Sequence, residues 1–383
     1  MANRRVGLWL VGAFGGVGST VAMGLSALSR GLATTTGLVT ANPLVSALAL
    51  DAPADFVVGG HDIRQSTFRE SALGLNERSG LFTARLIEAG SPDLLAWSEN
   101  VQPAPAAGSP KDAIDRVQAD VRAFQKKHAL DQVVVLNVAS TEPPFAAGPE
   151  HASLKALQAA LSRAENPALP ASGIYAYAAL DMGLPYVNFT PSFGATSPAL
   201  DELARLKKAP YAGQDGKTGE TLLKTVLAPM FAARNLKVHS WIGHNILGGG
   251  DGRTLSNPAN KASKVKSKDA SLPAILGYKP QSLVSIEYVE SLDDWKTAWD
   301  HIHFEGFLGT KMALQFTWQG CDSILAAPLA IDLARLALFA QRRGHAGVLA
   351  ELACFFKSPL GTAEQDFFKQ WRMFEAFVGR YVG

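Results

Sequence analysis

Hydrophobic residues in the first half of the chain form short, nearly unbroken runs separated by segments with helical periodicity. Residues 6–11 and 132–138 are apolar through most of their length, which is typical of strands buried on both faces of a parallel sheet. Strands that alternate with helices predict an α/β lobe with a parallel sheet. A clear helical repeat lies at Ile114, Val117, Val121 and Phe124. Further helices are predicted at 21–28, 154–161, 222–231, 324–340 and 346–356, with a further strand at 186–189.

The pattern changes in the second half of the chain. Residues 237–242 form a strand pattern, and residues 283–289 and 312–318 alternate as half-buried antiparallel strands do. Because one face of such strands is polar, they predict a second lobe with an open sheet. A chain of 383 residues also exceeds the size at which one core stops growing. We therefore expect a first lobe from residues 1–225 and 336–383, and a second lobe inserted at 226–335.

Composition narrows the class of protein. A hydrophobic content of 47% and a charged content of 18% describe an ordinary folded domain, and a net charge of +2 gives no support for a nucleic-acid surface. Two cysteines, Cys321 and Cys354, are too few for a disulfide framework and indicate a reducing compartment. No run reaches the roughly 18 apolar residues that a membrane span needs. We expect a cytoplasmic protein without a membrane or nucleic-acid partner.

A glycine-rich turn follows the first predicted strand, and a helix follows the turn. This order directs backbone N–H groups and a helix N-terminus at a pyrophosphate. The spacing G-x-x-G-G-x-G differs from the common G-x-G-x-x-G, so a merely tight turn is the alternative. An acid is expected at the end of the second strand, and the candidate is Asp62, which requires a long excursion before it. The candidate cofactor residues of the turn are Gly12, Phe14, Gly15, Gly16, Val17, Gly18 and Ser19.

Two further segments carry polar residues where a ligand could bind. Ser140 and Thr141 follow the strand at 132–138, where open α/β sheets bind ligands, although capping of the next element is an equal alternative. A second glycine-rich turn at 211–221 precedes a helix. It lacks the full spacing of a phosphate loop, but the N–H groups of residues 218–221 could form a weaker phosphate cradle.

A third glycine-rich stretch, at 243–252, leads into a cluster of lysines. If residues 261–268 are helical, Lys261, Lys264 and Lys268 lie on one face and could hold a phosphate or an enolate. A solvated surface run is the alternative. Lys357 ends an apolar segment just before a proline. A partner of the helix dipole is the alternative to a functional role for this lysine. No metal-ligand spacing is present, and His301 and His303 alternate on a predicted strand and are not expected to be ligands.

Taken together, these motifs resemble those of the myo-inositol-1-phosphate synthase family, in order along nearly the whole chain. Gly12–Thr20 resembles its glycine-rich NAD turn, and residues 60–63 resemble its Gly-Trp-Asp-Ile. Residues 139–142 resemble Ala-Asn-Thr-Glu, and residues 186–188 the start of an Asn-Gly-Ser-Pro segment. Further matches are 215–221 to Asp-Phe-Lys-Ser-Gly-Gln-Thr, 245–252 to Asn-His-Leu-Gly-Asn-Asn-Asp-Gly, 263–268 to Ser-Lys-Glu-Ile-Ser-Lys, 322–328 to Asp-Ser-Leu-Leu-Ala-Ala-Pro, and 357–360 to Lys-Ala-Pro-Leu.

The resemblance implies a Rossmann-like NAD-binding domain with an inserted α+β domain that carries catalysis and tetramer assembly. It implies NAD-dependent, redox-neutral conversion of D-glucose 6-phosphate to 1D-myo-inositol 3-phosphate, by oxidation at C5, enolisation, aldol closure onto C1 and reduction. The residues implied as catalytic are Lys264, Lys268, Lys357, Asp322 and Asp251. Those implied for NAD are the turn residues with Asp62, Ala139, Ser140, Thr141, Asp215 and Asp251, and those for the substrate phosphate are Lys217, Thr218, Gly219, Glu220, Thr221 and Asn245.

Three departures from the family pattern bear on the choice of substrate. Gly249 and Gly250 stand where the family has two asparagines, and Glu287 stands where some members have a lysine. Residues 188–191 rewrite the Asn-Gly-Ser-Pro segment. Losing a cation weakens oxyanion stabilisation unless Lys266, Lys296 or Lys311 compensates. The alternatives are a related cyclase for another sugar phosphate, a net NAD-dependent oxidoreductase, and a binding protein without turnover.

Overall fold

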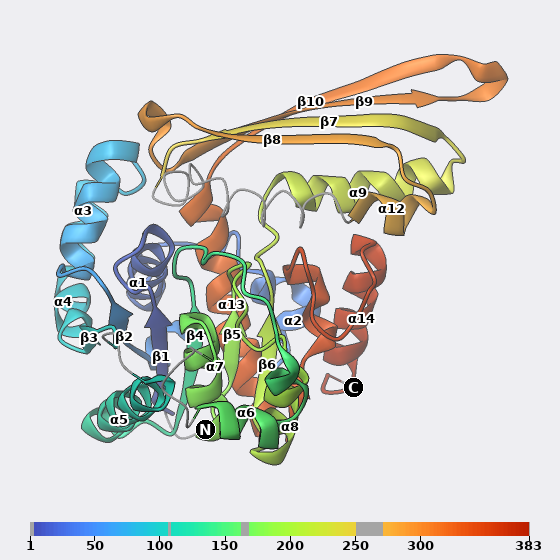
Figure 1. Cartoon of the computed structure of the whole chain (residues 1–383). Coiled ribbons are helices and arrows are strands. Elements are labelled where there is room, and N and C mark those ends of the chain that lie inside the picture. Colours follow the sequence, from blue (N-terminus) through green and yellow to red (C-terminus); the bar gives the residue numbers. More distant parts are fainter. Residues whose placement is uncertain (1–3, 106–108, 162–167, 250–270, 383) are drawn as a thin grey trace.

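The first of two sheets is fully parallel and forms the centre of the lower lobe (Figure 1). The computed structural model describes residues 4–105, 109–161, 168–249 and 271–382. The strands lie in the order β11-β6-β5-β4-β1-β2-β3, and each neighbouring pair is parallel. Their bounds are β1 Val6–Val11, β2 Phe56–Asp62, β3 Val101–Pro103, β4 Gln132–Asn137, β5 Tyr186–Asn188, β6 Pro210–Gly213 and β11 Gly347–Val348.

Helices cover both faces of this sheet because its central strands are apolar on both sides. Along β1, Leu8 and Leu10 pack into one core, whereas Trp9 and Val11 pack into the other. The first face carries α1 Gly16–Ser29, α3 Phe68–Ser79, α4 Ala84–Ser98, α13 Asp322–Arg342 and α14 Phe367–Gly379, with the short α2 Pro43–Ser46 nearby. The second face carries α5 Pro110–His128, α6 Leu154–Leu161, α7 Ala171–Asp181 and α8 Pro198–Leu206. The predicted doubly wound, Rossmann-like lobe is confirmed.

A second, mixed sheet lies above the first lobe (Figure 1). Its order is β10-β9-β7-β8, with bounds β7 Lys237–Leu247, β8 Gln281–Tyr288, β9 Trp295–Glu305 and β10 Lys311–Cys321. The helices α9 Glu220–Ala233 and α12 Ser271–Leu276 cover its inner face, where Phe231 packs against Trp241 and Phe304. The outer face leaves Leu283 and Trp299 exposed, so this sheet is open on one side as predicted.

Three expectations about individual elements were wrong or incomplete. Strand β8 pairs in parallel with β7, because a long connection lets the chain cross over, whereas β9 and β10 form the expected antiparallel pair across a short turn. Alternation along a strand reports a half-exposed face, not a direction. Strand β7 extends to Leu247, so half of the expected glycine-rich stretch at 243–252 is regular sheet. Residues 346–356 form β11 and a 3₁₀ helix at Ala350–Phe355 in place of an α-helix.

The helix α13 joins the second sheet to the core of the first lobe. It is long and apolar enough to cross a membrane by length and composition alone, but 72% of its most apolar stretch is buried inside the molecule, as in a core helix. The excursion between α1 and β2 folds back onto α13, where Asp332 accepts hydrogen bonds from the Val39 N–H and the Thr40 hydroxyl. Burial raises the pKa of Asp332 to about 6.

Candidate functional site

The glycine turn after β1 has the geometry of a dinucleotide cradle. Gly12 has φ of +85°, and a Cβ built on it would lie 2.7 Å from the Ala139 Cα. A Cβ on Gly18 would lie 2.4 Å from the Ala13 carbonyl oxygen. Gly15 caps α1 without any side-chain hydrogen bond. The first turn of α1 carries glycines at positions 16 and 18, which let a ligand approach its N–H groups closely, and these residues fit a pyrophosphate.

Asp62 ends β2 directly beside this turn. Its Oδ2 accepts a hydrogen bond from the Phe14 N–H at 2.7 Å, and its Oδ1 accepts one from the Arg64 N–H at 2.8 Å. The side chain is buried. The long excursion expected between the turn and the acid is present as residues 30–55, between α1 and β2. The structure thus brings together a glycine turn and an acid that are about 45 residues apart, in the arrangement of a dinucleotide site.

The end of β4 lies on the other side of the turn, where the order of strands reverses between β1 and β4. Ala139 donates its N–H to Asn137 Oδ1 at 3.2 Å, Thr141 is buried and Ser140 is exposed. Asn137 in turn donates to Asn188 at 3.2 Å, at the end of β5. Ligands bind at such reversal points, so this polar edge continues the cradle.

A short antiparallel ladder places Asp215 against Lys357. The N–H of Lys357 donates to the Asp215 carbonyl at 2.7 Å, and the N–H of Lys217 donates to the Phe355 carbonyl at 2.8 Å. The Lys357 Nζ lies 2.8 Å from Asp215 Oδ1, and both side chains are at least nine-tenths buried. The interpretation of Lys357 as a partner of a helix dipole is wrong, since residues 350–355 form a 3₁₀ helix and its amine binds a carboxylate.

Lys217 points toward the C-terminal helix. Its Nζ donates to Gln370 Oε1 of α14 at 2.6 Å and lies 5.9 Å from the centroid of the Phe367 ring. Burial, together with the nearby positive charge of Lys357, lowers the pKa of Lys217 to about 8. Because the Lys217 amine is buried against α14, this residue can affect an anion at the turn of residues 218–221 mainly through its positive charge and through the position of its backbone.

The turn at 218–221 leads into the N-terminus of α9. Gly219 caps this helix without a side-chain hydrogen bond. Thr221 Oγ1 is buried and has no hydrogen-bond partner among the described residues. The Glu220 carboxylate turns inward and lies 2.7 Å from the Lys224 Nζ, with both side chains buried. This pairing neutralises Glu220, so the helix N-terminus can still attract an anion.

Lys296 and Asp322 form a second ion pair that the sequence reasoning did not assign. Lys296 Nζ lies 3.2 Å from Asp322 Oδ1, and its side chain is 14% exposed. The pair forms because β9 and β10 are in register, with Lys296 opposite Gly320. Asp294 Oδ2 accepts hydrogen bonds from the N–H and hydroxyl of Ser323, which fixes the start of α13. No spacing in the sequence signals this pair, because it depends on strand register.

The remaining candidate residues either do not join these contacts or fall outside the described residues. Asp251, Lys264, Lys266 and Lys268 fall outside the described residues. Glu287 is exposed on the outer face of β8, on the side opposite to the buried Ile286, so it does not put an acid into the cleft side of the sheet. Lys311 begins β10, about 33 Å along the strand from Cys321, and cannot compensate there. Asn245 is buried on the inner face of β7, where its amide donates to the Ser285 carbonyl at 3.3 Å.

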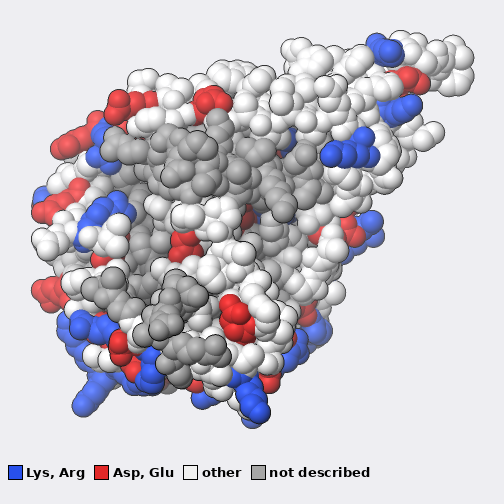
Figure 2. Space-filling view, viewed as in Figure 1, with Lys and Arg blue, Asp and Glu red and all other residues white. Residues whose placement is uncertain are grey.

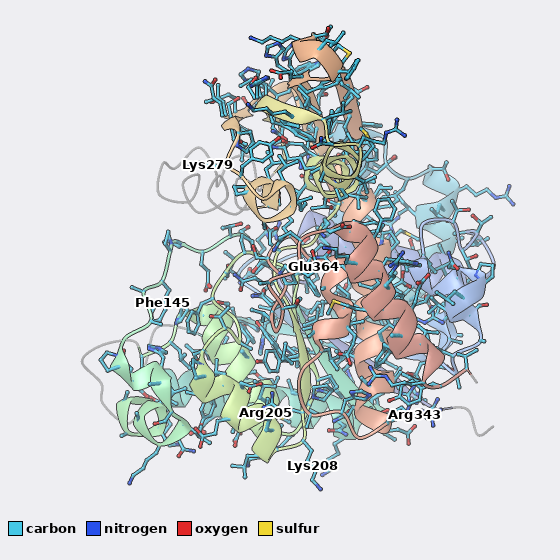
Figure 3. All side chains as sticks on the ribbon, turned by 90° about the vertical axis from the view of Figure 1, so that its right-hand side faces the viewer. Phe145, Arg205, Lys208, Lys279, Arg343 and Glu364 are labelled. Carbon is cyan, nitrogen blue, oxygen red and sulfur yellow. The ribbon has the colours of Figure 1, made fainter. Side chains whose placement is uncertain are left out.

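The Lys and Arg side chains of the described residues lie mostly at the edges of the face seen in Figure 2. Figure 2 shows the Lys and Arg side chains of this face mainly along the lower rim of the first lobe and near the end of the β9–β10 hairpin. Figure 3 places Arg205, Lys208 and Arg343 at the end of the first lobe farthest from the second sheet. Both cysteines are buried free thiols, as expected, and burial raises the pKa of Cys354 to about 12. In the described ranges no cluster of three His, Cys, Asp or Glu side chains could hold a metal ion.

Comparison with known proteins identifies the family. An NAD-binding family model described as myo-inositol-1-phosphate synthase matches residues 6–379. The chain belongs to the myo-inositol-1-phosphate synthase family. Inositol-3-phosphate synthase 1 from Bacteroides thetaiotaomicron is 32% identical, over 100% of this chain and 96% of that protein. The expected family, the Rossmann-like fold and NAD as the cofactor are therefore confirmed.

Solved structures agree with this assignment. The crystal structure of inositol-3-phosphate synthase from Caenorhabditis elegans superposes with a TM-score of 0.87 at 26% identity, and covers 99% of this chain and 86% of that one. A myo-inositol-1-phosphate synthase-related protein from Thermotoga maritima shares the fold, with a TM-score of 0.79 at 23% identity over 98% of this chain and 99% of that one. The second lobe is thus part of the family architecture and not an addition to it.

Proposed function

We propose that the chain converts D-glucose 6-phosphate to 1D-myo-inositol 3-phosphate without net redox change. Family membership over residues 6–379 supports the reaction. The observation that carries the proposal is the buried Asp215–Lys357 pair, in which Asp215 precedes the anion-attracting start of α9 at Glu220 by five residues. A cation fixed in a water-poor site stabilises a sugar oxyanion most strongly.

Each group of residues has its own role in the proposed reaction. NAD, when bound, supplies the oxidation and the later reduction. The glycine turn with Asp62 and the 139–141 edge hold the dinucleotide, and the N–H groups of residues 218–221 hold the substrate phosphate. Lys357, oriented by Asp215, steadies negative charge on the substrate oxygen. Asp322 orients Lys296 as a second cation. By family position Lys264, Lys268 and Asp251 complete the site, and Lys264→Ala is expected to lower turnover at least ~100-fold.

This arrangement addresses the departures from the family pattern. Lys296 supplies a cation beside Asp322, whereas Glu287 lies on the outer face of the sheet. The loss of a lysine at position 287 therefore does not remove a cation from the inner face. Glucose 6-phosphate remains the proposed substrate, and a relative acting on another sugar phosphate is the second candidate because Gly249 replaces an asparagine.

Assembly and location are also proposals. The outer face of the second sheet exposes Leu283 and Trp299, and the hairpin tip exposes Phe307 and Leu308, at 87% and 85%. Apolar area of this kind is typical of a subunit interface. We propose that this sheet pairs with a second copy in a homotetramer in the cytoplasm. The lobe boundaries at 225/226 and 335/336 remain a prediction, and the helices α9 and α13 run across them.

The test is incubation with NAD and glucose 6-phosphate. The product is identified by phosphorus and carbon NMR, and absorbance follows NADH. The proposal expects an inositol monophosphate with no accumulation of NADH. Stoichiometric NADH would instead identify a net oxidoreductase, turnover only with another sugar phosphate would identify the related cyclase, and NAD binding without any turnover would identify a binding protein.

A further inference from the structure

Arg64 lies at the place where the adenosine end of the cofactor is expected. It follows the end of β2 by two residues, and its Nε lies 3.2 Å from Asp62 Oδ1. A Cβ built on Gly15 would lie 3.2 Å from a terminal nitrogen of the Arg64 guanidinium. The guanidinium therefore spans the acid and the glycine turn.

These two residues have opposite effects on a cofactor. In Rossmann-like sites an acid after the second strand bonds the 2′-hydroxyl of NAD, whereas an arginine nearby accommodates the 2′-phosphate of NADP. A lone Asp62 carboxylate would repel a 2′-phosphate. Arg64 offsets that charge and is 55% exposed, and the Asp62 carboxylate also accepts hydrogen bonds from the backbone N–H groups of Phe14 and Arg64. Ile63, between them, is 90% exposed and offers an apolar surface for the adenine base.

We propose that Arg64 is a specificity-determining residue at the adenosine ribose, and that it allows this chain to bind a dinucleotide with a 2′-phosphate in addition to NAD. The planar guanidinium forms two parallel hydrogen bonds with phosphate oxygens, which a neutral side chain cannot replace. The inference rests on the proposed placement of the adenosine ribose at Asp62.

The experiment is isothermal titration of the cofactor-free full chain with NAD and with NADP. We expect the affinity of the unaltered protein for NADP to be at most roughly 100-fold lower than its affinity for NAD. Arg64→Gln is expected to lower the affinity for NADP at least about tenfold and to change the affinity for NAD by no more than about threefold. Arg64→Lys keeps the charge and is expected to retain more NADP affinity than Arg64→Gln. Thermal unfolding of each variant checks that the fold is intact.

Arg205 supplies a matched control. Its Nε lies 2.7 Å from Asp201, its side chain is 60% exposed, and it lies at the far end of the lobe (Figure 3). Arg205→Gln is expected to change neither affinity. The proposal is overturned if the unaltered protein rejects NADP more strongly than stated, if Arg64→Gln weakens both cofactors equally or neither, or if Arg64→Lys behaves like Arg64→Gln.

A further variant separates this inference from the proposed cofactor site. Asp62→Asn removes the acid and is expected to weaken NAD about tenfold, the scale of a charge-assisted hydrogen bond. If Asp62→Asn leaves NAD binding unchanged, the placement of the ribose is wrong. If Asp62→Asn weakens NAD binding but Arg64→Gln leaves the ratio of NAD affinity to NADP affinity unchanged, only the role proposed for Arg64 is wrong.

Discussion

The two halves of the candidate site each contain a buried acid, but different forces stabilise the two acids. Asp62 accepts hydrogen bonds from the backbone N–H groups of Phe14 and Arg64. Asp215 is balanced by the ammonium of Lys357, which lies 142 residues further along the chain. The first arrangement is built from backbone shape around a turn, and the second from two charges kept away from water. Changes to the glycine turn itself should therefore act through sterics, and changes to the Asp215–Lys357 pair through electrostatics.

The largest effect is expected for Lys357→Met. We expect turnover to fall at least ~100-fold, the scale of losing one oxyanion donor, while NAD binding persists. Removal of the ammonium beside the buried Asp215 carboxylate should also lower the free energy of unfolding by roughly 3–5 kcal/mol. Turnover is measured by product NMR and stability by urea unfolding.

Lys369 is the control for that variant. Its amine lies 3.5 Å from Glu364, and its side chain is 65% exposed. Lys369→Met should leave turnover and stability nearly unchanged, since exposed pairs contribute little. Near-normal turnover in Lys357→Met would show that the cation is not part of the catalytic machinery.

On the cofactor side, Gly12→Ala tests the role of backbone shape. Alanine at φ of +85° is strained, and its Cβ would lie 2.7 Å from the Ala139 Cα, so we expect a loss of roughly 2–5 kcal/mol in stability and weaker NAD binding. Gly31 has φ of +66°, and no atom of the described residues lies within 4 Å of a Cβ built on it, so Gly31→Ala shares the backbone strain without the collision. Equal losses in the two variants would contradict a close approach between Gly12 and Ala139.

The buried charge of Lys217 predicts a dependence of stability on pH. Burial lowers the pKa of Lys217 in the folded state to about 8, from an ordinary value of 10.5. Between these values the unfolded chain binds a proton that the folded chain does not, so stability should rise as pH increases from 8 to 10.5, by up to about 3 kcal/mol. In Lys217→Met, the free energy of unfolding measured with urea should rise less steeply with pH over this range. An unchanged slope would mean that another group causes it.

The smallest effect is expected for Glu287→Gln. The side chain is exposed on the outer face of β8, away from the inner face that carries Asn245. Turnover per subunit should stay within about twofold, as for most surface substitutions. A tenfold change would place Glu287 near the substrate and would reopen the choice of substrate.

Local patterns predicted much of the cofactor half and less of the second lobe. Strand, glycine turn and helix are adjacent in sequence, and Asp62 could be found because few acids follow the turn. The parallel pairing of β8 could not be read, because alternation is the same for both strand directions. The Lys296–Asp322 pair also escaped notice, since only the register of β9 with β10 brings these residues together.

The sequence by itself determined the buried parallel strands, the glycine turn, the family motifs and therefore the cofactor, because each depends on neighbouring residues or on fixed short spacings. Only the tertiary structure decided which charges meet. Lys357 faces Asp215, Lys296 faces Asp322, Lys217 turns to Gln370, and Glu287 faces outward. Coulomb interactions depend on distance in space and on exclusion of water, and neither is encoded by position along the chain.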